Sequence, residues 1–134
     1  MIVVDTNIIS YLLVRNDTYT ADAKELFRKD SAWVSPALWK FEFFNLINLY
    51  RKRNLMSENA MRDIFFKSLE TVETVDLVDL TFLYNVATAS DLTGYDAQFV
   101  ALASEMNLPL ITEDKRILSE FGNTSISIKN FLNE

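Results

Sequence analysis

The sequence predicts an α/β fold, in which helices cover both faces of a mostly parallel, five-stranded sheet in three layers, α/β/α. Short apolar runs of strand length alternate with longer segments in which apolar residues recur at helical spacing. The runs at residues 2–4, 32–34 and 110–112 are nearly continuous in apolar residues, which is typical of strands buried on both faces. The chain has 134 residues, of which 49% are hydrophobic, so we expect a single domain over residues 1–134.

Three of the five predicted strands are short apolar runs, and the other two, at residues 74–77 and 125–128, alternate apolar with polar residues. The first, Ile2-Val3-Val4, is followed at once by an aspartate. The second is Ala32-Trp33-Val34, and the fourth is Leu110-Ile111-Thr112. The strands are expected at residues 2–5, 32–34, 74–77, 110–112 and 125–128.

The predicted helices carry start and stop signals. Thr6 or Asn7 is expected to cap a first helix that runs through Leu13. Ser35 is expected to cap a later helix with Pro36 in its first position, which continues to about residue 50 and ends in three cations. The other helices are expected at residues 20–29, 57–69, 80–90 and 95–106, with a short one that ends at residue 122.

Composition excludes several classes of site. The chain has no Cys and no His, which makes a zinc site improbable and excludes a Ser-His-Asp or Cys-His catalytic centre. The absence of Cys fits a reducing compartment, so we expect a cytoplasmic protein. Lys and Arg number 13 against 19 Asp and Glu, a net charge of −6 that argues against nucleic-acid binding by a general basic surface. No apolar run approaches the ~20 residues of a membrane span, so no membrane association is expected.

The most informative feature is the placement of four carboxylates. Asp5 ends the first apolar run, Asp114 follows the last long one, and Asp96 opens an apolar helix. Glu42 lies within a helix that is otherwise almost wholly apolar. The carboxyl ends of parallel strands share one edge, where ligands bind, so these acids are expected to meet there around a cation. A site with oxygen ligands alone favours Mg²⁺ or Mn²⁺ and also permits Ca²⁺.

Taken singly, these acids also have structural explanations. Asp5 and Asp114 are each placed to cap the helix that follows, and Asp96 to interact favourably with the dipole of its own helix. Glu42 is harder to explain in this way, because a lone charge among apolar neighbours is costly. The joint placement of all four therefore argues for a site more strongly than any one of them.

Four segments resemble the motifs of PIN-domain nucleases, and specifically those of VapC-type toxins from toxin–antitoxin pairs. The opening VVDTNIIS is similar to the first motif, and its acid maps to Asp5. The stretch VSPALWKFEFFN maps the second acid to Glu42, and YDAQFVALA maps the third to Asp96. The run LPLITEDKRI maps the family's hydroxyl to Thr112 and its fourth acid to Asp114. Together the four segments cover essentially the whole chain in the expected order.

The resemblance implies a metal-dependent endoribonuclease, usually dimeric and held inactive by a small antitoxin protein. We expect Asp5 and Asp96 to bind Mg²⁺ or Mn²⁺ directly, and Glu42 and Asp114 to do so directly or through water. A bound metal ion lowers the pKa of a nearby water and polarises a phosphate, which is the chemistry of RNA hydrolysis. Four polar side chains are expected to hold the carboxylates or the waters around the metal, unless they serve only local capping or core hydrogen bonds: Thr6, Asn7, Asn45 and Thr112.

The sequence also carries signals for RNA binding and for dimer formation. Lys115 and Arg116 directly follow Asp114 and are expected to contact RNA phosphates. The helix of residues 37–50 presents more apolar surface than one side of a core covers, which predicts a homodimer.

Alternatives from other classes remain open at this point. A phosphoacceptor receiver would use Asp76 near the third strand and Lys129 near the fifth, although it lacks the early acidic pair. A phosphotransferase similar to the haloacid dehalogenases wants a second Asp two residues after Asp5, where this chain has Asn7. A catalytically silent binding domain of the same fold is the third alternative.

Overall fold

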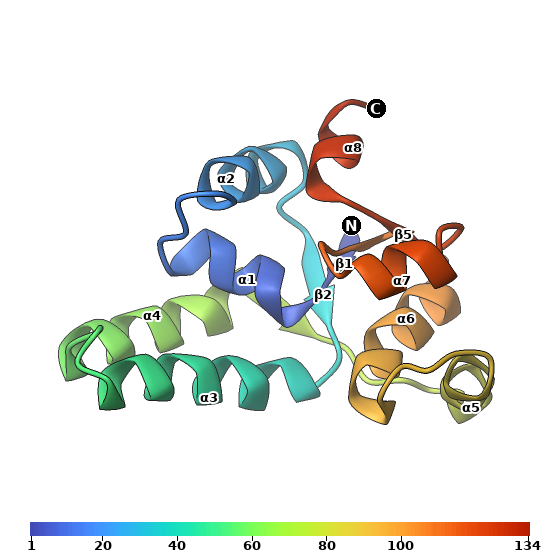
Figure 1. Ribbon diagram of the computed structural model, residues 1–134, viewed down its shortest axis with the longest axis horizontal. Coiled ribbons are helices and arrows are strands. Elements are labelled where there is room, and N and C mark those ends of the chain that lie inside the picture. The colour runs from blue at the N-terminus through green and yellow to red at the C-terminus, as the bar shows by residue number, and fades with distance from the viewer.

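The computed structural model describes residues 1–134 and contains a five-stranded sheet with helices on both faces (Figure 1). The strand order is β3-β2-β1-β4-β5, and every neighbouring pair is parallel. The predicted α/β class and five-stranded sheet are confirmed, and the sheet is parallel throughout rather than mostly so. The strands are β1 (Ile2–Val4), β2 (Trp33–Ser35), β3 (Val72–Thr74), β4 (Leu110–Ile111) and β5 (Ser125–Ile126).

The chain changes direction across the sheet at β1. From this central strand it moves outward through β2 to β3, then returns past β1 to form β4 and β5 on the other side. Val3 of β1 is accordingly paired with Val34 on one side and Leu110 on the other. The gap between β1 and β4 is a topological switch point, which is where α/β sheets bind ligands. A receiver has the order 2-1-3-4-5, so the receiver alternative is wrong on topology.

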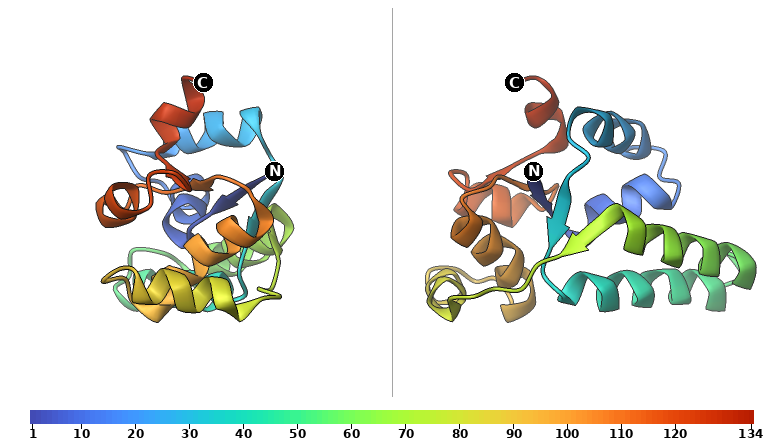
Figure 2. Two further views of the ribbon diagram at one scale, coloured as in Figure 1. Left: turned by 90° about the vertical axis from the view of Figure 1, so that its right-hand side faces the viewer. Right: turned by 180° about the vertical axis from the view of Figure 1, so that it is seen from behind.

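The helices form two groups. The larger group packs around α1 on one side of the sheet, while α5 and α6 pack together on the other with α7 beside β5 (Figures 1 and 2). Seen from behind, α3 and α4 lie side by side and extend away from the sheet (Figure 2). No helix has the length and apolar character needed to cross a membrane. The helices are α1 (Thr6–Leu13), α2 (Thr20–Lys29), α3 (Leu38–Lys52), α4 (Glu58–Thr71), α5 (Leu80–Thr88), α6 (Gly94–Met106), α7 (Lys115–Glu120) and α8 (Ile128–Leu132).

A single core of 24 buried residues joins the sheet to both helix groups. All three residues of β1 are buried, as its central position requires. On α3, burial is confined to the stripe Trp39, Phe43 and Ile47, spaced one turn apart. On α6 it extends around most of the helix, from Phe99 to Ala103. Thus α6 is a central helix, whereas α3 keeps much of its circumference outside the core.

The ends of the third and fifth strands differ from the prediction. The third strand is Val72–Thr74 rather than residues 74–77, because α4 continues to Thr71 and passes into the strand without a loop. The fifth ends at Ile126 rather than at residue 128, because the hydroxyl of Ser127 accepts a hydrogen bond from the Asn130 N–H and starts α8. The helix α8 was not predicted.

The cap of the first helix is Asp5, as the structural explanation of this acid predicts, and not Thr6 or Asn7. Asp5 is the residue before α1, and its Oδ1 accepts a hydrogen bond from the Ile8 N–H at 3.1 Å. The physical reason is that β1 ends one residue earlier than expected, which leaves Asp5 free to turn.

The prediction that Ser35 caps the third helix is wrong. Ser35 is the last residue of β2, and its buried hydroxyl donates to the Val4 carbonyl at 2.5 Å. Pro36 precedes α3, which begins only at Leu38 and has no side-chain cap. A serine at a buried strand end therefore serves the neighbouring strand instead of the helix. Ser57 does cap α4 as predicted.

Candidate active site

All four carboxylates singled out from the sequence line one cavity of about 150 Å³. Asp5 follows β1 and Asp114 follows the end of β4, so the cavity lies at the carboxyl edge of the sheet, at the switch point. Glu42 comes from the second turn of α3, and Asp96 comes from the first turn of α6. The remaining lining residues are Thr6, Asn7, Leu46, Phe99 and Ile117.

Asp5 is the most buried of the four acids, with 8% of its surface exposed. Its Oδ1 caps α1, and its Oδ2 accepts a hydrogen bond from the hydroxyl of Thr112. Burial, and to a smaller extent the charge of Asp114, raise the pKa of Asp5 to about 6 against the lowering effect of these hydrogen bonds. Asp5 is therefore a carboxylate whose ionised form is poorly stabilised by the protein alone.

Thr112 connects two of the acids. It is fully buried, and the hydroxyl that donates to Asp5 also accepts a hydrogen bond from the Asp114 N–H at 3.0 Å. Asp114 in turn caps α7, since its Oδ1 accepts from the Ile117 N–H at 3.0 Å. One threonine thus fixes the relative position of the ends of β1 and β4.

Glu42 is held by a second hydroxyl. Its Oε1 accepts a hydrogen bond from the Thr6 hydroxyl at 2.7 Å, which ties α3 to the start of α1. Burial raises the pKa of Glu42, and the nearby charge of Asp96 raises it further. Glu42 is thus half-buried beside other acids rather than free in solvent.

Asp96 is not the cap of its helix. That role belongs to Thr93, whose hydroxyl accepts a hydrogen bond from the Asp96 N–H at 3.1 Å. Burial and the charge of Asp114 raise the pKa of Asp96, whereas Thr93 and the positive charge of Arg116 lower it. The Asp96 carboxylate is therefore not needed to cap the start of α6 and remains available to the cavity.

The donor set fits a hard divalent cation. The ionisable groups that line the cavity are all carboxylates, and the polar groups beside them are the hydroxyl of Thr6 and the amide of Asn7. Oxygen donors of this kind suit Mg²⁺ or Mn²⁺, whose charge would offset the mutual repulsion of the acids. No group of three acidic side chains is arranged to hold one ion as the side chains stand.

Comparison with known proteins identifies the fold family. The family described as PIN domain matches residues 2–122. The chain belongs to the PIN domain family. The family-level resemblance drawn from the four sequence motifs is confirmed. PIN domains are generally nucleases, and they usually use divalent metal ions. No protein with a curated description matches the sequence.

Solved structures show the same PIN fold at low sequence identity. The chain is similar to PAE2754 of Pyrobaculum aerophilum, with 20% identity and a TM-score of 0.76 over 98% of this chain and 92% of that one. It is similar to VapBC2 of Rickettsia felis bound to a promoter DNA fragment, with 15% identity and a TM-score of 0.71 over 95% and 98%. It is also similar to a toxin–antitoxin complex of Klebsiella pneumoniae, with 19% identity and a TM-score of 0.65 over 96% and 98%.

Not every residue singled out from the sequence lies at the cavity of this PIN domain. Asn7 lines it, but Asn45 is exposed on α3 and is not among its lining residues. Lys115 and Arg116 are both exposed in the first turn of α7. Asp76, considered for a receiver, is exposed and away from the cavity.

Three apolar lining residues were missed by the sequence reasoning. Leu46 lies four residues after Glu42, and Phe99 and Ile117 each lie three residues after an acid. Side chains three or four residues apart share one helix face, so this spacing was the available signal. These apolar groups form part of the cavity wall and contribute to the burial that raises the carboxylate pKa values.

Glu113, the acid directly before Asp114, has a different role. The Glu113 carboxylate accepts a hydrogen bond from the Ile128 N–H at 2.9 Å, at the start of α8. It therefore positions the C-terminal helix and is not among the residues that line the acidic cavity.

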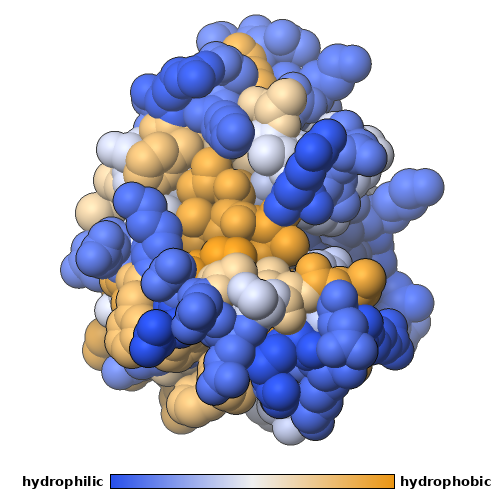
Figure 3. Space-filling view, turned by 90° about the vertical axis from the view of Figure 1, so that its left-hand side faces the viewer, coloured by the Kyte–Doolittle hydropathy of each residue, from blue (hydrophilic) through white to orange (hydrophobic).

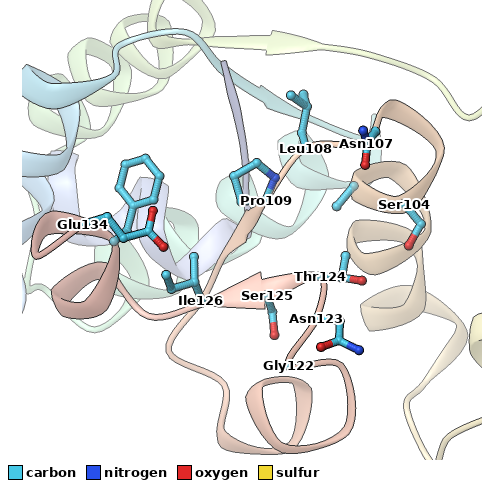
Figure 4. A pocket seen from close by; sticks show the side chains of 12 residues that line it. Ser104, Asn107, Leu108, Pro109, Gly122, Asn123, Thr124, Ser125, Ile126 and Glu134 are labelled. Atoms are coloured by element: carbon cyan, nitrogen blue, oxygen red, sulfur yellow. The ribbon is translucent and has the colours of Figure 1, made fainter.

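A larger cavity of about 300 Å³ lies at the opposite, amino edge of the sheet (Figure 4). It is bounded by the segments that lead into β4 and β5, including Pro109 and Thr124. Its only acidic lining residue is Glu134, so it offers no cluster of charged groups for metal or phosphate chemistry. Size alone does not identify the active site of this PIN domain.

Proposed function

We propose that this PIN domain is a Mg²⁺- or Mn²⁺-dependent endoribonuclease and the toxin component of a toxin–antitoxin pair. The observation that carries the proposal is the cavity at the switch point, where Asp5, Glu42, Asp96 and Asp114 come together from four separate segments. Raised pKa values at three of these acids support it, because they indicate carboxylates that a cation would stabilise in the ionised form.

Asp5 and Asp96 are the proposed direct ligands, with Glu42 and Asp114 binding directly or through water. When bound, Mg²⁺ or Mn²⁺ supplies Lewis acidity to the scissile phosphate and lowers the pKa of water beside it. The carboxylates must rotate toward the ion, since no three of them are arranged around one point as the side chains stand. The hydrogen bonds from Thr112 to Asp5 and from Thr6 to Glu42 restrict that rotation.

The partner proposal has separate support. Related folds occur in structures described as VapBC2 and as a toxin–antitoxin complex. In this chain, hydrophobic side chains form a band framed by hydrophilic ones on the end of the molecule seen in Figure 3. We propose that a small antitoxin covers this band. The outer surface of α3, where Phe41 and Phe44 are exposed, is the proposed contact of a homodimer.

The activity is tested by incubating the purified protein with RNA in Mg²⁺ or Mn²⁺, with and without excess EDTA. We expect internal cleavage that requires the metal. Cleavage that survives thorough chelation contradicts the metal mechanism. RNA binding without cleavage in either metal favours the catalytically silent domain.

The biological setting is tested by expressing the protein from its native operon with one affinity tag. A small protein that co-purifies in stoichiometric amount and suppresses RNA cleavage is the expected result. An active protein that purifies alone, with no inhibitory partner encoded beside it, argues for a housekeeping nuclease of the same fold.

A further inference from the structure

Arg116 is exposed in the first turn of α7, between Asp114 and Ile117, which both line the acidic cavity. Among the charged groups that shift the pKa of Asp5, Glu42 or Asp96, it is the only cation. Its guanidinium donates a hydrogen bond to the Asp91 carbonyl at 3.4 Å, in the segment that leads into α6. This contact places Arg116 between the element that carries Asp114 and the one that carries Asp96.

The guanidinium keeps most of its binding capacity. The three ion pairs of the molecule are Met1–Asp30, Arg15–Asp17 and Arg28–Glu25, and none of them includes Arg116. An arginine has five N–H donors, and here one of them is used, by a backbone carbonyl. The remaining donors and the whole positive charge are available to a ligand.

RNA can approach the acidic cavity only if positive charge is present beside it. The chain carries a net charge of −6, and four carboxylates line the cavity, so a phosphate is repelled until positive charge is supplied. A guanidinium matches two phosphate oxygens at once because of its planar, forked geometry.

Lys115, the neighbouring cation, differs in its surroundings. Its side chain makes no hydrogen bond or ion pair, and its charge is not among those that shift the pKa of the cavity acids. Adjacent residues on a helix point in different directions, so only one of this pair can face the cavity directly. The hydrogen bond to the Asp91 carbonyl holds Arg116 toward the segment that leads into α6 and Asp96, and Lys115 makes no such contact.

We propose that Arg116, and not Lys115, binds an RNA phosphate at the mouth of the acidic cavity and so positions the strand for cleavage. This inference rests on the proposed function. It extends that proposal by distinguishing between the two cations for which the sequence alone predicts the same role.

The test compares Arg116→Ala with Lys115→Ala, since both remove one exposed positive charge from the same turn. Binding of a fluorescein-labelled single-stranded RNA is measured by anisotropy in Mg²⁺, with Glu42→Gln in the background to prevent cleavage. We expect Arg116→Ala to raise Kd about tenfold, as for a lost hydrogen bond to a charged group. It should also reduce the slope of log K against log salt by about 0.7. Lys115→Ala should change both quantities clearly less, and Arg116→Lys should recover part of the loss.

Two further measurements make the outcome decisive. The rise in Tm on adding Mg²⁺ should be the same in Arg116→Ala as in the parent, which shows that the metal site is intact. Equal effects of the two alanine variants, or an unchanged salt slope in Arg116→Ala, overturn the inference. If the parent cleaves RNA and Arg116→Ala binds it normally, only this inference fails. If the parent neither binds nor cleaves RNA, the proposed function fails with it.

Discussion

Asp5 uses its two oxygens for different partners, and this determines which acid is the best one to mutate. One oxygen caps α1 and the other accepts from Thr112, so a change at Asp5 alters a helix start as well as the cavity. Asp114 likewise caps α7. Asp96 has no such duty, because Thr93 caps its helix. A substitution at Asp96 therefore separates a role in the site from a role in the fold.

Replacing Asp96 by Asn should abolish metal-dependent RNA cleavage while the metal-free protein stays folded. The change keeps size, removes one charge from a set of mutually repelling acids, and so leaves Tm equal or higher without metal. Added Mg²⁺ should raise the Tm of the parent more than that of the variant, as thermal unfolding measures directly. Cleavage at the parent's rate, or loss of activity only through unfolding, contradicts the assignment.

The raised pKa of Asp5 predicts an unusual pH dependence of stability. The folded-state pKa of about 6 exceeds the unfolded value of about 3.9, so between these values the folded state binds more protons. Stability therefore falls as pH rises through this window, by about 3 kcal/mol from this group. Glu42 and Asp96 shift in the same direction. In EDTA, urea unfolding should show a more stable protein at pH 5 than at pH 7.5.

The comparison with Asp5→Asn isolates this contribution. The amide can still cap α1 and face Thr112, but it does not titrate, so the difference between the two pH values should shrink. A parent protein that becomes more stable from pH 5 to pH 7.5 in EDTA, or an equal pH dependence in both proteins, contradicts this account.

Thr112 should matter to both stability and activity through its hydroxyl. Replacing it by Val removes the donor to Asp5 and the acceptor for the Asp114 N–H in a fully buried position. We expect a loss of about 1–3 kcal/mol in the free energy of unfolding, together with weakened metal binding and slower cleavage. Thr112→Ser keeps the hydroxyl and should retain cleavage, although it loses a buried methyl group. If Thr112→Val and Thr112→Ser inactivate the protein equally, the loss comes from altered packing and not from the missing hydroxyl.

At the scale of single elements, the sequence predicts which helices and strands form better than it predicts where each one begins and ends. The helix α4 and its cap Ser57 were predicted because a good N-cap stands directly before an apolar helical pattern. Ser35 offers the same signal, but it caps no helix, because its hydroxyl donates a hydrogen bond to Val4 of the neighbouring strand β1. The five-residue α8 is too short to show a period, and its start depends on Glu113 from a distant loop. Such partners are set by tertiary structure.

The start of α6 should control the proposed metal site because it carries Asp96. Thr93→Ala removes the cap of α6 and should lower stability by about 1 kcal/mol. It should also reduce the Tm rise caused by Mg²⁺, since the first helical turn frays. Ser57→Ala is the matched control, because it removes an equivalent cap from α4, away from the cavity. If both variants lose stability and respond to Mg²⁺ alike, the α6 cap does not position Asp96.

At the scale of the whole molecule, the strand order is the part that sequence could not supply. Alternation of strands and helices predicts a parallel sheet, but several orders satisfy it. The order decides that β1 and β4 are neighbours, and hence that Asp5 and Asp114 share a cavity. The four acids were nevertheless selected correctly as cavity residues, because each stands at a strand end or on a strongly apolar helix. Asn45 was selected by spacing alone and lies outside.

The dimer proposal concerns the outer surface of α3. Phe41→Glu should convert a dimer into a monomer in light scattering at micromolar concentration, with little change in Tm, because Phe41 is 70% exposed in the single chain. Tyr84→Glu on α5 is the control, since it places the same charge on an aromatic residue that is 68% exposed in the other helix group. If the parent protein is a monomer, or if Tyr84→Glu breaks the dimer and Phe41→Glu does not, α3 is not the dimer contact.

The hydrogen bond between Thr112 and Asp5 joins residues 107 positions apart, and this has a consequence for the timing of activity during synthesis. A ribosome makes β1 well before β4, so a growing chain carries Asp5, Glu42 and Asp96 before Asp114 exists to join them. Non-local pairing of this kind also forms slowly. The proposed nuclease is thus latent during synthesis until β4 has been made and has paired with β1.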